Sequence, residues 1–328
     1  RLHTYSVRPV LWNGATGEES TTEITTPQYP PPAAPKELTG TPGVRSALLR
    51  WGGDEPGIES YRILRTLPGH RDPTVVAEVP ATGATQAFID RLLPPNQNVT
   101  YRVLAVAVDG SASEPSAPVT LRPLQAPTPV ISLPLKGTLD EASGLHPQVH
   151  GAPSFETINE RKVLRLGPGR WLAFEDRPEF DIPCEITLEA WVRFDDLSGM
   201  PVLIGHSRWM ERGYFLQVLG GAVRFHLALE GGGLNADAGR IAPGQWVHIV
   251  GTFDGDVARV YVNGEQVGAF QRPNSLAPFI VPYSGPLYIG RYHEESPMYE
   301  VHGCLGGVAV FNGALSAETV RARFDAGL

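Results

Sequence analysis

The chain has 328 residues, 42 % of them hydrophobic, and a formal net charge of −8. This length and composition suit two or three domains with packed cores. Nucleic-acid binding is not expected, because an acidic chain without a basic block repels the phosphate backbone. No segment approaches the ~18 consecutive apolar residues of a membrane span. The 31 Pro and 36 Gly indicate frequent turns and linkers, which are typical of an all-β modular protein.

Residues 1–26 repeat part of a later segment. The sequence Tyr5–Val10 is similar to Tyr101–Val106. The spacing between the two copies is close to the roughly 100 residues of one β-sandwich module. We therefore expect residues 1–26 to be the last two strands of a truncated module. Because the chain starts at Arg1 without a signal-peptide pattern, we also expect it to be a processed or excised piece of a longer protein.

These two strands are expected to pair as a hairpin. One strand is Tyr5–Val10, the other lies near Thr21–Thr26, and the turn falls at Gly14–Gly17. Two strands alone are marginally stable in water. The hairpin therefore needs a cover, and the alternatives are upstream domains, a second polypeptide that completes the module, or residues 33–124.

Residues 33–124 contain the pattern of a complete sandwich. The Pro-rich residues 27–32 precede them and predict a semi-rigid connector. An early strand ends on Trp51, a second strand covers Tyr61–Arg65, and Leu93-Pro94 leads to Tyr101. This set resembles the fibronectin type III domains, in which the tyrosine hydroxyl of such a corner bonds the backbone upstream. The resemblance also makes residues 1–26 a partial fibronectin-like hairpin.

Residues 131–328 follow a second linker, residues 125–130. Here Gly244–Gly255 alternates with a period of two, and Asn263-Gly264 supplies the positive φ angles of a tight hairpin turn. The sequence resembles the laminin G-like, concanavalin A-like jelly-roll domains. The same family pattern recurs in the strands at Ile186–Val192, Leu287–Gly290 and Gly303–Asn312. The expected fold is therefore all-β, a fibronectin type III sandwich followed by a jelly-roll sandwich.

Domains of this laminin G-like type usually bind glycans or other proteins and catalyse nothing. Related glucanases carry their carboxylates on one strand face, where acid and nucleophile flank the sugar bond. Glu185 and Glu189 do not form that motif, and no nucleophile elbow or phosphate loop is present. We expect no catalysis by this chain itself. An accessory role in a polysaccharide-degrading enzyme stays open.

The laminin G-like resemblance also implies a calcium site. In the family, one carboxylate comes from an Asp-x-Ser-Gly turn and a second from a Gly-x-Ile-Asp strand, and calcium needs several such oxygen ligands. Asp140 matches the first position, but Gly306 stands at the second. Calcium with Asp140 as a ligand therefore remains an open alternative. Cys184 and Cys304, the only cysteines, fit one disulfide or two free thiols equally well.

Two loops combine aromatic and polar side chains, the mixture that binds sugars by stacking and hydrogen bonding. They cover residues 206–214 and 291–299. We expect Trp209 and Tyr292 to stack on a sugar ring, and Arg208 and Arg291 to bond hydroxyl or acidic groups. The full set of candidate ligand-binding residues is Arg208, Trp209, Tyr214, Arg291, Tyr292 and His293. The alternative is that both loops pack against other domains.

The leading hypothesis is a non-catalytic carbohydrate-binding or spacer segment at the C-terminal end of a secreted bacterial enzyme that acts on polysaccharides. The alternative is an adhesion or structural cell-surface protein without an attached enzyme. Both hypotheses place the chain outside the cell or at its surface. The expected partners are a glycan and the upstream domains or second polypeptide that complete the N-terminal module.

Overall fold

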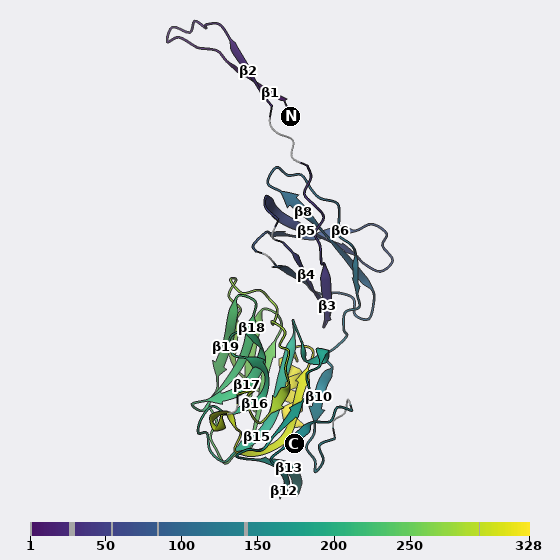
Figure 1. Cartoon of the computed structure of the whole chain (residues 1–328), viewed down its shortest axis with the longest axis vertical. Coiled ribbons are helices and arrows are strands. Elements are labelled where there is room, and N and C mark those ends of the chain that lie inside the picture. Colours follow the sequence, from purple (N-terminus) through teal and green to yellow (C-terminus); the bar gives the residue numbers. More distant parts are fainter. Residues whose placement is uncertain (1, 26–29, 54, 84, 141–143, 295) are drawn as a thin grey trace.

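The computed structural model describes residues 2–25, 30–53, 55–83, 85–140, 144–294 and 296–328. An extended hairpin is followed by two β-sandwiches and a short helix, α1 (Ala317–Asp325) (Figure 1). The expectation of an all-β protein with two sandwiches is confirmed. Within the described ranges, no helix is both long and apolar enough to cross a membrane.

The N-terminal hairpin pairs β1 (Leu2–Val7) with β2 (Ser20–Thr25) in an antiparallel register. The first strand starts three residues earlier than the sequence predicts. Its apolar side chains lie open to solvent, and Trp12 in the connecting turn is 98 % exposed. Figure 1 shows the hairpin standing clear of both sandwiches. The hairpin therefore does not pack against residues 33–124, which was one of the three alternatives for covering its apolar side chains.

The first sandwich has a three-stranded and a four-stranded sheet. The sheets are β3 (Thr39–Gly43), β4 (Ser46–Gly52) and β7 (Thr85–Asp90), and β6 (Thr74–Pro80), β5 (Ile58–Thr66), β8 (Val99–Ala107) and β9 (Val119–Leu121). Trp51, Tyr61 and Tyr101 are almost fully buried between them. These three aromatic residues, which carry the sequence pattern, therefore form the centre of this core.

The tyrosine corner differs from the sequence expectation. The Tyr101 hydroxyl donates its hydrogen bond to the Asp90 carboxylate at 2.8 Å and not to a backbone carbonyl upstream. Arg65 donates two further bonds to Asp90, at 3.0 and 2.9 Å. Burial and this carboxylate partner raise the pKa of Tyr101. An ion pair between the two sheets, Arg65 of β5 with Asp90 of β7, thus takes the place of the backbone acceptor.

The second sandwich packs a front sheet on a back sheet. The front sheet runs in the order β11 (Gln148–His150), β14 (Trp171–Phe174), β23 (Leu287–Ile289), β16 (Val202–Arg208), β17 (Arg212–Leu219), β18 (Ala222–Leu229) and β19 (Gly232–Ala238). The back sheet runs β12 (Ser154–Ile158), β13 (Arg161–Leu166), β24 (Gly303–Phe311), β15 (Ile186–Phe194), β20 (Val247–Phe253), β21 (Val257–Val262) and β22 (Glu265–Gln271), with β10 (Pro129–Leu133) paired to β24.

Alternation along the strands decides which side chains enter this core. On β15, Leu188 and Ala190 are fully buried between the sheets, whereas Glu189 and Trp191 alternate with them and face the opposite side. Gly251 allows the two sheets to approach, because a Cβ atom there would lie 2.5 Å from the Phe225 ring. The alternation leaves the outer face of each sheet free to carry a site.

The two sandwiches contact each other directly. The Glu185 carboxylate, 7 % exposed, accepts a bond from the Ser46 hydroxyl at 2.5 Å and another from the Val44 amide at 3.2 Å. Beside it, Leu48, Cys184 and Phe279 form a buried cluster across the interface. Burial raises the pKa of Glu185 against the effect of these hydrogen bonds. The interface therefore combines an apolar centre with a buried polar contact.

Both cysteines are free thiols in this structure. Cys184 lies in the interface, and Cys304 lies on β24 at the far side of the second sandwich beside Arg165. Burial raises the pKa of each thiol. Of the two alternatives left by the sequence, the structure has the pair of buried thiols.

Candidate functional site

A pocket of about 180 Å³ lies on the outer face of the front sheet. Its floor comes from β16, β17 and β18, and its wall comes from the segment that follows β23. The lining residues are Met200, Val202, Trp209, Phe215, Gln217, Arg224, Tyr292 and Tyr299. This pocket is smaller than the roughly 300–1,000 Å³ of sites for drug-sized ligands. It therefore suits a single ring or the end of a longer chain.

Trp209 is placed at the pocket by the tight turn between β16 and β17. Met210 follows it with φ of 61°, and its sulfur packs over Gly233, where a Cβ atom would come within 2.4 Å. Gly213 closes the turn with φ of 73°, and a Cβ atom there would meet the backbone oxygen of His206. The turn leaves the Trp209 side chain 42 % exposed. Its indole is thus fixed from below and open on one side.

His226 supports this indole from the sheet. Its ring lies 4.5 Å from the Trp209 ring and 4.6 Å from the Phe215 ring, with interplanar angles of 30° and 25°. Its Nδ1 lies 2.8 Å from the side-chain oxygen of Asn235. Burial lowers the pKa of His226 to about 4. The imidazole is therefore neutral at pH 7 and packs as an aromatic ring against both Trp209 and Phe215, whose own ring centres lie 5.6 Å apart.

Polar groups stand beside the aromatic platform. The Arg224 guanidinium lies 5.5 Å from the centre of the Trp209 ring and donates two bonds to Asp237, at 2.8 and 2.6 Å. Gln217 donates to the Met200 backbone oxygen at 2.9 Å. Both side chains are held by these partners before any ligand arrives. The arrangement therefore offers an apolar ring face with preorganised polar groups at its edge.

The wall of the pocket comes from the segment after β23. Tyr292 packs edge-on against Phe215, with ring centres 5.7 Å apart, and lies 5.2 Å from Tyr299. Tyr292 is only 4 % exposed, and burial raises its pKa to about 12. His293 lies against Tyr292 at 4.2 Å, and burial lowers the pKa of this histidine. Tyr292 thus shapes the pocket but does not present an open stacking face, which differs from the sequence expectation.

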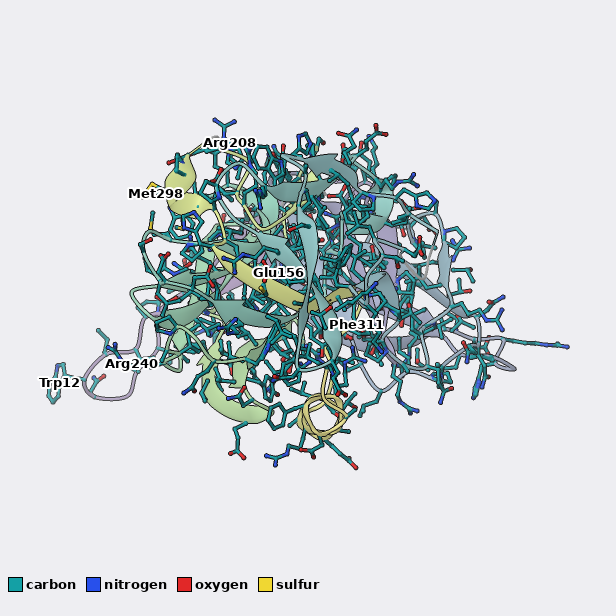
Figure 2. The ribbon with its side chains drawn as sticks, turned by 90° about the horizontal axis from the view of Figure 1, so that it is seen from below. Trp12, Glu156, Arg208, Arg240, Met298 and Phe311 are labelled. Atoms are coloured by element: carbon teal, nitrogen blue, oxygen red, sulfur yellow. The ribbon has the colours of Figure 1, made fainter. Side chains whose placement is uncertain are left out.

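The six predicted ligand-binding residues do not form one exposed cluster. Trp209, Tyr292 and the neighbouring His293 meet near the pocket, while Arg208 points to solvent at the edge of the molecule and pairs with Glu211 at 3.2 Å (Figure 2). Tyr214 is 1 % exposed, and its hydroxyl donates to the Phe180 backbone oxygen. Tyr214 alternates with the pocket-facing Phe215, so its side chain enters the core.

Arg291 also differs from its expected role. It is 5 % exposed, and its guanidinium lies 4.2 Å from the centre of the Trp171 ring. It donates to the backbone oxygens of Tyr292 at 2.7 Å and His293 at 3.2 Å. These contacts bind the segment after β23 to the front sheet. Arg291 is therefore placed to position the pocket wall and has little surface left for a ligand.

Sequence reasoning missed the pocket residues Met200 and Val202, and also four residues of β17 and β18: Phe215, Gln217, Arg224 and His226. The signal was available, because β17 and β18 alternate with a period of two and these residues occupy the outer positions of that alternation. The strands are hydrophobic on both faces at several positions, which masks the pattern. The loop residue Trp209 stood out, whereas the strand residues that support it did not.

The structure gives no support around Gly306 for the calcium site that the sequence left as an open alternative. Asp140 is exposed, and residues 141–143 of its turn lie outside the described residues. At Gly306, a Cβ atom would come within 2.0 Å of a Leu328 side-chain carbon, so the place of the family carboxylate is filled by an apolar side chain. Within the described ranges, no group of three or more His, Cys, Asp or Glu side chains suits a metal ion.

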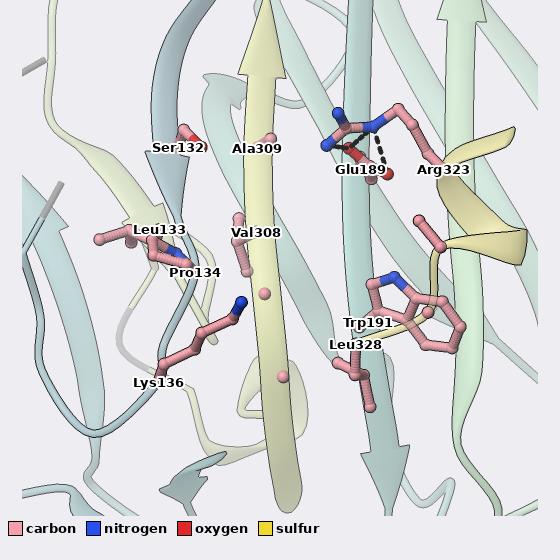
Figure 3. Close-up of a pocket in the computed structure, with 14 residues that line it drawn as sticks. Ser132, Leu133, Pro134, Lys136, Glu189, Trp191, Val308, Ala309, Arg323 and Leu328 are labelled. Atoms are coloured by element: carbon pink, nitrogen blue, oxygen red, sulfur yellow. Dashed lines mark hydrogen bonds and ion pairs between the residues drawn. The ribbon is translucent and has the colours of Figure 1, made fainter. Parts of the chain in front are cut away.

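The strand carboxylates Glu185 and Glu189 have structural partners. Glu185 belongs to the interface between the sandwiches. Glu189 contacts His248 at 2.7 Å and Arg323 at 2.6 Å, as Figure 3 shows for the arginine. Burial opposes the ionisation of Glu189, but the hydrogen bonds from His248 and Arg323 outweigh it and hold its pKa below the usual value. These two carboxylates therefore face different partners and do not flank a common site.

The family comparison concerns the second sandwich. Residues 166–321 match the family described as the concanavalin A-like lectin/glucanases superfamily. This stretch is a laminin G-like, concanavalin A-like jelly-roll. It contains the front-sheet pocket and most of both sheets. No curated protein matches the chain.

Several solved structures are similar to the chain at 14 % identity. One is domain 4 of AbnA, an extracellular arabinanase from Geobacillus stearothermophilus, whose structure was solved with arabinotriose. The match has a TM-score of 0.47 and covers 60 % of this chain and 98 % of the AbnA domain. The binding domain of botulinum neurotoxin DC in complex with SialylT has a TM-score of 0.46, with coverages of 60 % and 51 %. A Trypanosoma rangeli sialidase has a TM-score of 0.42, with coverages of 88 % and 52 %. The chain thus spans about half the length of the last two.

Proposed function

We propose that the front-sheet pocket binds a carbohydrate and that the chain is a non-catalytic glycan-binding module. The observation that carries this proposal is the half-exposed Trp209, fixed over His226 and Phe215 at the mouth of a pocket. An aromatic face of this kind binds the apolar face of a sugar ring, and polar groups beside it select among hydroxyl patterns. Arg224 and Gln217 are the polar groups at hand.

The mixture of apolar and polar side chains in the pocket favours a sugar over a wholly apolar ligand. Trp209 and Phe215 supply apolar surface, while Gln217 and Arg224 stand on the same floor with their side chains already oriented. A preoriented polar group loses less side-chain entropy on binding than a free one. A ligand with both a flat apolar face and hydroxyl groups uses the two kinds of surface together.

In the larger setting, we propose that residues 33–124 are a fibronectin type III domain and that the chain serves a secreted, polysaccharide-acting enzyme outside the cell. The partnered state of Glu185 and Glu189 supports a role without catalysis in this chain. The alternative is an adhesion or structural cell-surface protein without an attached enzyme. The direct contact between the sandwiches favours that alternative, because it fixes their relative orientation.

A glycan array tests the proposal. The chain is applied to plant, algal, bacterial and host glycans as the parent protein, as Trp209→Ala and as the matched control Trp12→Ala. Trp12 is 98 % exposed on the distant hairpin, so its removal changes exposed aromatic surface without touching the pocket (Figure 2). We expect a parent signal that Trp12→Ala keeps and Trp209→Ala loses. A signal that survives Trp209→Ala would contradict the proposed site.

The size of the effect follows from the stacking contact. Stacking on an aromatic side chain contributes roughly 1–3 kcal/mol. We therefore expect titration calorimetry with an array ligand to show about tenfold weaker binding by Trp209→Ala, since ~1.4 kcal/mol is one decade. The thermal midpoint should stay nearly constant, because the indole is 42 % exposed. A large drop in the midpoint with unchanged affinity would assign Trp209 to packing.

A further inference from the structure

A second hollow region lies on the outer face of the back sheet, away from the pocket. Two adjoining hollows of about 260 and 370 Å³ share Lys136, Gly306 and Leu328 in their lining. We call the two together the back groove. Figure 3 shows the first hollow, with Lys136 reaching toward β24 from one side and Trp191, Glu189 and Arg323 on the other.

Two glycines in the middle of β24 line the back groove, of which Gly306 is covered by the Leu328 side chain and Gly307 is open. Gly306 and Gly307 leave the strand without side chains at two successive positions. Glycine inside a strand costs conformational entropy, and it often marks a place where a ligand or another backbone comes close. The space above Gly307 is open, because a Cβ atom there would meet only the Leu133 oxygen, at 3.7 Å. A ligand can therefore approach the backbone of β24.

Unpaired cations gather at one end of this groove. Lys136, Arg161 and Lys162 line the larger hollow together with a single carboxylate, Glu160. Among the described residues, no ion pair involves any of these three cations. This accumulation stands out in a chain whose net charge is −8. An anionic ligand is the partner that three neighbouring free cations favour.

Local structure brings these cations together. Leu135 is fully buried and holds a left-handed backbone, with φ of 51°, which directs the chain outward at Lys136. Asn159 and Glu160, with φ of 48° and 64°, make the tight turn between β12 and β13 that places Arg161 and Lys162 next to it. The Lys162 stem also packs over Gly137, where a Cβ atom would lie 2.5 Å from its Cδ.

We infer that the back groove binds an acidic oligosaccharide through its carboxylate or sulfate groups. Charge-assisted hydrogen bonds from lysine and arginine to such oxyanions are stronger than neutral ones. The two hollows together exceed the space that one small ion needs, and the open backbone at Gly307 leaves room for a sugar ring. This site goes beyond the proposed front-sheet site and lies on the opposite sheet, so either can fail alone.

Titration calorimetry with three tetrasaccharides tests the inference. The probes are a heparin-derived tetrasaccharide with sulfate and carboxylate groups, an oligogalacturonide with carboxylates only, and neutral maltotetraose. We expect the full chain to bind an acidic probe, and Lys136→Glu and Lys162→Glu each to weaken that binding by about tenfold or more. Lys36→Glu is the matched control, because Lys36 is the remaining lysine and lies in the first sandwich. It should bind as the parent does.

Two further variants test the direction of the charge effect and the location of the binding site. Glu160→Gln removes the carboxylate at the groove and should tighten binding, whereas Trp209→Ala should leave it unchanged. Loss of affinity in Lys36→Glu equal to that in Lys136→Glu would overturn the inference in favour of unspecific charge attraction. Binding of neither acidic probe, equal binding of maltotetraose, or binding only to anionic lipid vesicles would overturn it as well.

Discussion

His226 shows how a titratable residue serves as part of an aromatic stack. Its pKa falls from 6.5 to about 4 because burial disfavours the charged imidazolium. The unfolded chain therefore binds one more proton than the folded chain between these two pH values. The free energy of unfolding then decreases as the pH falls through this window, by up to about 3 kcal/mol.

The variant His226→Phe tests this linkage. It keeps a ring in contact with Trp209 and Phe215 but removes the titrating group. Urea unfolding at pH 7 and pH 4 should show a larger loss of stability for the parent than for His226→Phe, by about 3 kcal/mol. Other groups titrate in both proteins and cancel in the comparison. Equal losses would mean that folding does not lower the pKa of His226.

At the scale of elements, one polar contact between the sandwiches comes from the start of a strand, beside the Leu48–Cys184–Phe279 cluster and the Arg91–Asp256 ion pair. Glu185, just before β15, accepts bonds from Ser46 and Val44 of the first sandwich. A buried polar group left without its partner costs about 1–3 kcal/mol. We expect the double-mutant cycle of Ser46→Ala and Glu185→Ala to give a coupling free energy of about 1–2 kcal/mol in unfolding experiments. A coupling near zero would show that the contact does not hold the two sandwiches together.

Prediction from sequence succeeded for elements with strong local signals. Asn263 and Gly264 take φ of 51° and 76° in the turn between β21 and β22, as a tight hairpin requires. Ser316, a residue type that is favoured at helix N-caps, begins α1 by accepting a hydrogen bond from the Thr319 amide. Such features depend on neighbouring residues alone. They could therefore be identified without knowing how the sheets pack.

The site was harder to predict, because it depends on which side of a strand faces the partner sheet. Trp191 occupies a strand, where a tryptophan is usually part of a core, but it lies on the outer face of β15, stacked on His248 and Phe324. Tyr292 and Arg291 were expected in an exposed loop, but the segment folds back onto the front sheet. Register and long-range packing decide these positions, and no local pattern reports them.

At the scale of the whole molecule, the hairpin is separate from the two sandwiches. The side chains of β2 and most of those of β1 are exposed, and the hairpin stands apart in Figure 1. We therefore expect deletion of residues 1–26 to leave the thermal midpoint of the remaining chain nearly unchanged, as followed by calorimetry. A marked fall would show that the hairpin is an integral part of the first sandwich.

Glycan binding at Trp209 is tested most directly by a crystal structure of the chain with the oligosaccharide that binds best on the array. We expect a sugar ring on the open face of Trp209, with Arg224 or Gln217 at its hydroxyl groups. The predicted result is a ring in van der Waals contact with that indole, at roughly 3.5–4.0 Å between carbon atoms. A ligand bound elsewhere on the sandwich, with the pocket empty, would contradict the claim.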